Sequence, residues 1–88
     1  MEQTMNMSCQ VCAVTSTKGE VTPLWCKYQD AEGEIRKITI SEVKPGNGMH
    51  GIRAELYECT AYDDERKAVF LLECDFETHK WRILKRLL

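Results

Sequence analysis

The sequence predicts an all-β fold: a small six-stranded antiparallel meander that forms a closed or partly open barrel. Six runs of residues alternate between apolar and polar side chains, which is the period of a strand and not of a helix. Turn-forming residues separate these runs at intervals of roughly 8–12 residues, as in small all-β domains. We expect the sheet to curl shut because a flat meander would leave two edge strands exposed to other chains.

A chain of 88 residues is long enough for one hydrophobic core and too short for two. We therefore predict a single β domain over residues 1–88, with frayed ends at residues 1–7 and 85–88. No apolar run approaches the roughly 20 residues that a bilayer-spanning helix requires, so no membrane association is expected. The first residues lack the basic and apolar regions of a secretory signal, and the cytoplasm is the expected location.

Three strands are predicted in the first half of the chain, over residues 8–15, 24–29 and 35–43. Glycines at positions 19 and 33 mark the two turns between them, because glycine adopts positive φ at little cost. Pro23 lacks an amide hydrogen, so we expect the strand that follows it to lie at an edge or to begin there. In that strand one face carries Leu24, Cys26 and Tyr28, and the other carries Trp25, Lys27 and Gln29.

Three more strands are predicted in the second half, over residues 52–61, 67–76 and 80–84. The fifth strand is the most apolar, and one of its faces carries Phe70, Leu72, Cys74 and Phe76. Residues 44–51 contain three glycines and a proline, so they form the longest irregular segment. The last four residues are compatible with a helical turn after the sixth strand.

Several strand and turn positions span residues 11–84: Pro23-Leu24-Trp25, Gly33, Ile38, Val43, Gly51-Ile52-Arg53 and Lys80-Trp81. In this arrangement the chain resembles a group of short bacterial proteins of uncharacterised function that are taken to be small β-barrels. The resemblance implies the fold and implies no activity. The chain departs from the pattern in its acidic turn at Asp63–Lys67 and in its basic C-terminal tail.

Charge is unevenly distributed along the chain. Residues 1–79 carry a net charge of −6, and the tail adds +4 through Lys80, Arg82, Lys85 and Arg86. An acidic body disfavours nucleic-acid binding, because contacts with phosphates require a basic face. We interpret the basic end as a solvated tail.

Five cysteines cannot all pair within one chain, and in a reducing compartment we expect free thiols. Cys9 and Cys12 form a CxxC motif, a spacing that binds zinc or carries redox chemistry in other folds. Here the motif lies in a predicted strand, where residues three apart point to opposite faces. We therefore predict no cofactor and no metal, and keep a zinc or thiol site at this motif as an alternative. Its further ligands would come from Cys59, Cys74, His50 and His79.

Two groups of residues are candidates for binding. Trp25 and Tyr57 belong to a set of aromatic side chains that would form a stacking platform if they shared one face. The second group is the glycine-rich segment with Gly46, Asn47, Gly48 and His50. Its amides would suit an anion and its imidazole would move a proton. The competing interpretations are core packing for the aromatic residues and a plain hairpin connection for the segment.

No Ser-His-Asp or Cys-His arrangement stands out, and the carboxylates fall mainly in turns and on polar strand faces. The predicted function is therefore a non-catalytic β domain, not an enzyme, that binds a protein partner or associates with itself. The edge strand expected at Pro23 supports this hypothesis. A single-stranded nucleic-acid-binding barrel is the alternative, motivated by the fold and by the basic tail.

Overall fold

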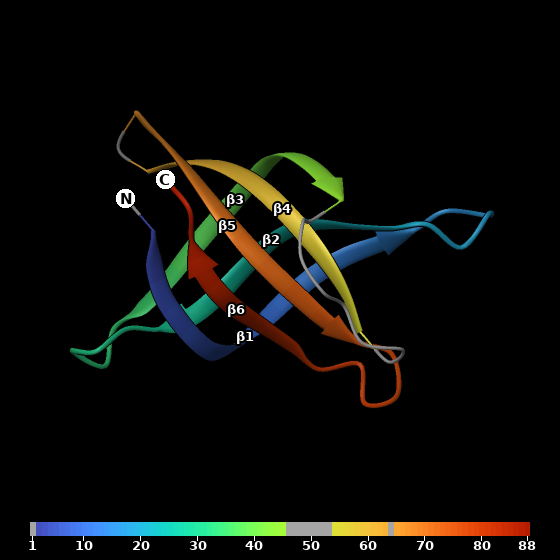
Figure 1. The fold of residues 1–88 in the computed structure, drawn as a ribbon, viewed down its shortest axis with the longest axis horizontal. Helices are drawn as coiled ribbons and strands as arrows, with labels where there is room; N and C mark the ends of the chain where they lie inside the picture. Colours follow the sequence, from blue (N-terminus) through green and yellow to red (C-terminus); the bar gives the residue numbers. More distant parts are fainter. Residues whose placement is uncertain (1, 46–53, 64) are drawn as a thin grey trace.

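In the computed structural model the chain forms a closed barrel of six antiparallel strands that follow one another in sequence order (Figure 1). The structure describes residues 2–45, 54–63 and 65–88. The strands are β1 (Gln3–Thr15), β2 (Val21–Gln29), β3 (Ile35–Pro45), β4 (Ala54–Asp63), β5 (Arg66–Asp75) and β6 (Trp81–Arg86). The predicted fold class is confirmed, and the described residues contain no helix.

Two long strands turn the corners of the barrel. β1 pairs with β6 over Gln3–Cys9 and with β2 over Gln10–Thr15. β3 likewise pairs with β2 over Ile35–Thr39 and with β4 over Ile40–Pro45. Figure 1 shows the result: β2 and β3 run at a steep angle to β4 to β6. Each corner strand contains a register shift, and such bulges bend a strand so that it can serve two sheets.

Arg82 holds the corner of β1 in place. The shift between Thr4 and Met7 contains Asn6, whose φ of 45° is in the left-handed region that asparagine tolerates. The Arg82 guanidinium donates to Asn6 Oδ1 through Nε at 3.2 Å and through Nη2 at 2.9 Å. Nη2 also donates to the Asn6 carbonyl at 3.0 Å. These bonds join the two ends of the chain where β1 and β6 close the barrel.

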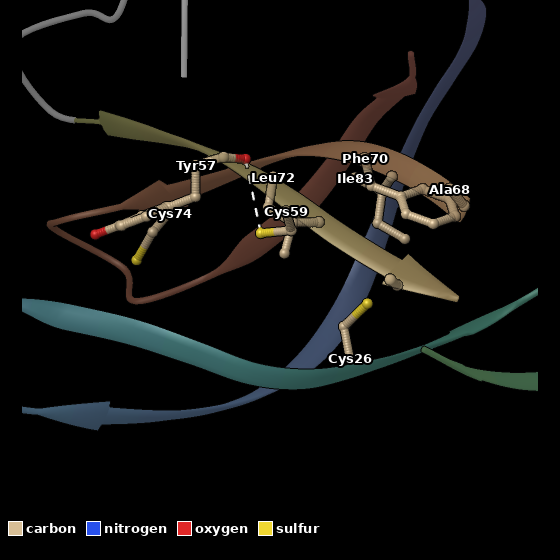
Figure 2. Packing of buried hydrophobic residues seen from close by; sticks show 9 residues of the cluster. Cys26, Tyr57, Cys59, Ala68, Phe70, Leu72, Cys74 and Ile83 are labelled. Atoms are coloured by element: carbon tan, nitrogen blue, oxygen red, sulfur yellow. Dashed lines mark hydrogen bonds between the residues drawn. The ribbon is translucent and has the colours of Figure 1, made fainter. Parts of the chain in front are cut away.

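The core fills the barrel interior and contains no buried polar or charged residue among those described. Its central members are fully buried and come from strands on opposite sides: Cys26, Cys59, Ala61, Ala68, Leu72 and Ile83. Figure 2 shows Cys26 on β2 pointing toward the side chains of β4 and β5. Small residues alternate with Phe70 and Tyr57, as expected where strands converge inside a narrow barrel.

The expected edge strand is not present as predicted. β2 pairs with β1 on one side, and from Trp25 to Gln29 it also pairs with β3 on the other. Pro23 is opposite Ala13 of β1, in the part of β2 that precedes the pairing with β3. The missing amide hydrogen of Pro23 is therefore tolerated, and the strand after it is not an edge.

Two residues that were predicted to share a strand face with core residues are exposed. Leu24 is 40% exposed because the register of β1 and β2 shifts at Cys12/Ala13, which makes Leu24 an extra residue between paired positions. Phe76 is 49% exposed because β5 ends at Asp75 and the chain turns there. Strand alternation alone cannot anticipate either change.

Both chain ends are more regular than predicted. β1 already begins at Gln3, and β6 continues to Arg86 instead of giving way to a helical turn. Beyond β6, the Leu87 amide donates to the Val69 carbonyl at 2.7 Å, so the end of the chain is attached to β5.

The described part of the chain holds no helix that is long and apolar enough to cross a membrane.

Candidate functional site

The predicted binding residues do not form one site. Trp25 lies on the outside of the barrel, because its neighbour Cys26 points into the core. Tyr57 is a buried member of the core cluster. The other candidates, Gly46, Asn47, Gly48 and His50, lie outside the described residues. The aromatic side chains are likewise divided between interior and exterior, so no common stacking platform forms.

Tyr57 has a structural environment. Its ring packs against Trp81 with centroids 5.4 Å apart, and its hydroxyl lies 3.3 Å from a carboxylate oxygen of Glu55. Burial, followed by the negative charge of Glu55, raises the pKa of Tyr57 to about 12. The competing interpretation of core packing therefore describes Tyr57 better than a role in a surface platform.

Trp25 is at the centre of a distinct surface that we call the Trp25 face. It comprises the outward positions of two rows across β1, β2 and β3: Cys12, Trp25 and Thr39 in one, and Gln10, Lys27 and Lys37 in the next. None of these six positions holds Asp or Glu, although the whole chain has 14 acidic residues. Exposed Leu24 adds an aliphatic side chain next to Trp25. The face is thus aromatic, aliphatic and cationic.

The two lysines of the Trp25 face are held over the indole ring. The Nζ atom of Lys27 lies 5.3 Å from the ring centroid and that of Lys37 lies 5.0 Å from it. Each contact is a cation–π interaction that contributes on the order of 0.5–1 kcal/mol at an exposed site. Lys27 and Lys37 are also direct cross-strand partners, and like charges in such pairs destabilise a sheet. The fold therefore tolerates a repulsive pair here.

The CxxC motif is split by the sheet. Cys12 is opposite Trp25 on the outer face, whereas Cys9 packs against the core. The hydrogen bond between the Cys9 and Cys26 thiols, followed by burial, raises the pKa of Cys9 well above its usual range. Burial raises the pKa of Cys59 to about 12 and also raises that of Cys74. These three thiols are therefore protonated at neutral pH, which makes them weak nucleophiles and weak metal ligands.

Metal-ligating side chains do not gather in the described parts of the chain. No group of three or more His, Cys, Asp and Glu residues is placed there so as to hold a metal ion. The cysteines that the barrel brings close together are Cys9, Cys26 and Cys59, from three different strands. This combination was not predicted, since only Cys9 belongs to the CxxC motif.

The split motif leads to a testable difference in thiol reactivity. With iodoacetamide at pH 7.5 we expect Cys12 to be the only thiol that is alkylated quickly, because it is on the outer face. The other four cysteines are also free thiols, but their side chains point inward or are buried. Mass spectrometry of the folded protein should show one alkyl group added first, and Cys12→Ser should abolish this fast step. Cys74→Ser is the matched control and should leave it unchanged. Fast modification of Cys9 in the folded protein would contradict the split.

A cavity of about 670 Å³ opens at the end of the barrel that holds both chain termini, and we call it the mouth. Met5, Met7, Ile38 and Phe70 line its inner part, and all four pack in or against the core. Tyr62 borders it and is 62% exposed. The rim is polar and carries the charged side chains of Asp30, Arg36 and Arg86. Barrel mouths are common places for small ligands.

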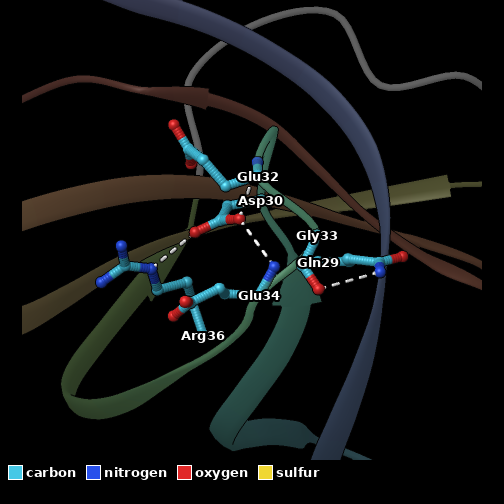
Figure 3. Close-up of polar contacts among 6 residues, drawn as sticks. All are labelled: Gln29, Asp30, Glu32, Gly33, Glu34 and Arg36. Carbon is cyan, nitrogen blue, oxygen red and sulfur yellow. Dashed lines mark hydrogen bonds and ion pairs between the residues drawn. The ribbon is translucent and has the colours of Figure 1, made fainter.

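The hairpin between β2 and β3 forms one wall of the mouth and is held together by Asp30 (Figure 3). Asp30 Oδ1 accepts hydrogen bonds from the amides of Glu32 at 3.0 Å and Glu34 at 2.9 Å. Its Oδ2 accepts from Arg36 Nε at 2.8 Å. The Arg36 guanidinium and these amides lower the pKa of Asp30. The charge of this carboxylate is therefore neutralised within the hairpin.

Arg86 is the residue at the mouth that sequence reasoning missed. It is opposite Phe70 in the β5–β6 register, so it shares the inner face with that ring. Its guanidinium carbon lies 5.5 Å from the Phe70 ring centroid, and its Nε donates to the Leu88 carbonyl at 2.8 Å. Alternation from Trp81 and Ile83 would direct Lys85 inward instead. The register shift at Leu71/Leu72 turns Arg86 inward in place of Lys85. The basic C-terminal segment, which was interpreted as a solvated tail, therefore places a cation inside the mouth.

No protein family, curated protein or solved structure matches this chain. The barrel expected from the resemblance to short bacterial proteins is present, whereas membership of that group stays a prediction. The functions of the Trp25 face and of the mouth therefore have to be inferred from the residues and contacts found there.

Proposed function

We propose that this protein is a non-catalytic interaction module whose docking surface is the Trp25 face, and that its partner is an acidic protein segment with apolar side chains. The main support is the pairing of Lys27 with Lys37 over Trp25, on a surface without a carboxylate. Carboxylates of a partner would relieve this repulsion, and its apolar side chains would cover Trp25 and Leu24. Closure of the barrel makes strand addition at Pro23 a poor way to bind, so side chains carry the recognition.

The exposed leucine favours a protein partner over nucleic acid. Single-stranded nucleic acid is bound by aromatic rings together with a basic groove several nucleotides long. Here only two lysines flank one tryptophan. The surface is extended by Leu24, which is 40% exposed and offers no favourable contact to a phosphate group. Tryptophan is instead one of the residues most enriched in the hot spots of protein interfaces.

The test is a comparison of Lys37→Glu with Lys67→Glu, which changes the net charge equally at an exposed position of β5. The probe is a fluorescently labelled random copolymer of glutamate and tyrosine, followed by anisotropy at low and high salt. We expect Lys37→Glu to weaken binding by at least about tenfold. We expect Lys67→Glu to change it by less than about twofold, and wild-type binding to weaken with salt.

The same substitution has a second readout that separates binding from folding. Lys37→Glu converts the repulsive cross-strand pair into an attractive one but removes a cation–π contact with Trp25, so the free energy of unfolding should stay within about 1 kcal/mol of the wild type while binding falls. A variant that binds less because it is unfolded would lose several kcal/mol of stability, of the order of the whole stability of a small domain. Thermal unfolding monitored by circular dichroism distinguishes the two.

Four results would overturn the proposal. Tighter, Lys37-dependent binding of oligothymidylate would assign the face to nucleic acid. A wild-type dimer that Lys37→Glu converts to a monomer in light scattering would assign it to a second copy of the chain. Equal effects of the two substitutions, or no copolymer binding at low salt, would show that the face is not a docking surface.

A further inference from the structure

We infer that the mouth of the barrel binds a small amphipathic anion, with its apolar body against Phe70 and the two methionines and its acidic group on Arg86. Of the residues named in the Trp25 face, Lys37 alone also lines the mouth, and the inference does not depend on the proposed interaction function. The cavity volume of about 670 Å³ is within the range of small-molecule sites.

The inner lining determines the apolar part of the ligand. Met5 and Met7 reach the cavity from β1, Ile38 from β3 and Phe70 from β5. Methionine side chains are flexible and polarisable, so they adapt to apolar ligands of varied shape. A flat or chain-like hydrocarbon body would cover surface that is otherwise open to solvent at the mouth.

Arg86 determines the sign of the polar part. Among the described residues it forms no ion pair with a carboxylate side chain, although the chain has a net charge of −2. Its Nε is bonded to the Leu88 carbonyl, and this bond orients the guanidinium and leaves its Nη groups for a ligand. Guanidinium groups bind carboxylate, sulfonate and phosphate through two parallel hydrogen bonds.

The acidic residues of the mouth do not cancel this preference. Asp30 already accepts from Arg36 and from two amides of its own hairpin. Glu32 is an exposed residue of the same turn. Arg86, in contrast, lies over the buried Phe70 ring, where a neighbouring anion would be less screened by water.

The experiment uses decanoate as the probe, with decanol and decyltrimethylammonium as neutral and cationic analogues of the same chain length. Binding is followed by NMR on protein labelled with ¹³C at the methionine methyl groups, so that Met5 and Met7 report on the mouth. We expect decanoate to shift both resonances and to bind at least about tenfold more tightly than decyltrimethylammonium. Arg86→Gln should lower decanoate affinity by about tenfold and leave decanol affinity within about twofold.

Lys80→Gln is the matched control, because it also removes one positive charge but lies in the turn before β6, at the other end of the barrel. It should bind decanoate as the wild type does. An unchanged amide spectrum of Arg86→Gln without ligand would show that the variant is folded. Equal decanoate affinity in wild type and Arg86→Gln, shifts that spare Met5 and Met7, or no decanoate binding by the wild type would each overturn the inference. Decyl phosphate in place of decanoate distinguishes a phosphate from a carboxylate as the preferred acidic group.

Discussion

Leu72→Ala is expected to lower the free energy of unfolding by about 3 kcal/mol, which is a large part of the stability of a domain this small. Leu72 is 0% exposed and lies on the inner face of β5, opposite Ile83 of β6. The substitution loses the transfer energy of the buried methyl groups and leaves a cavity, since the closed barrel limits how far its strands can move inward. Urea unfolding monitored by circular dichroism measures the change.

Leu24→Ala is the matched control for this prediction. It removes the same atoms from a side chain that is 40% exposed, so a loss below about 1 kcal/mol is expected. Leu72→Met keeps the volume and should cost less than about 1.5 kcal/mol. Similar losses for the two alanine variants would contradict the interior position of Leu72.

Alkaline pH is expected to destabilise the protein strongly between pH 9 and pH 12, because the pKa values of several thiols in or against the core, Cys59 among them, are raised. The pKa of the Cys59 thiol rises from 9.0 to about 12 in the folded chain, because burial disfavours the thiolate. Below pH 9 both states keep the proton and the stabilisation is fully present. Above pH 9 the unfolded state loses its proton first, so the free energy of unfolding falls by up to about 1.4 kcal/mol per pH unit. Tyr57, whose pKa is also raised to about 12, acts in the same direction above pH 10.

Cys59→Ala tests whether the Cys59 thiol contributes to alkaline unfolding. The quantity compared is the change in the free energy of unfolding with pH, and not the free energy of unfolding at one pH. Between pH 8 and pH 11, under reducing conditions, the variant should lose about 2.5 kcal/mol less than the wild type. Cys12→Ala, which changes a thiol on the outer face, should follow the wild-type curve. If Cys59→Ala has the same pH dependence as the wild type, the burial of the Cys59 thiol does not control alkaline unfolding.

The positions of Cys9 and Cys12 could be predicted from the sequence, whereas the Trp25 face and the mouth could not. The placement of Cys9 and Cys12 on opposite faces was correctly anticipated, because strand alternation over three residues is a local property. The special position of Trp25 depends on Lys37, which is brought opposite Lys27 only by the pairing of β2 with β3. The mouth was not anticipated at all, because its lining comes from all six strands and from the hairpin at Asp30.

Local sequence patterns were enough to predict six strands, since apolar alternation and turn-forming residues act over a few positions. Which face of each strand points into the barrel depends on the tertiary structure. Leu24 is the extra residue at one register shift and Arg86 follows another, and one extra residue in a strand reverses the direction of the next side chain. Those shifts depend on how the strands bend to close the barrel, so they arise from contacts between residues far apart in the chain.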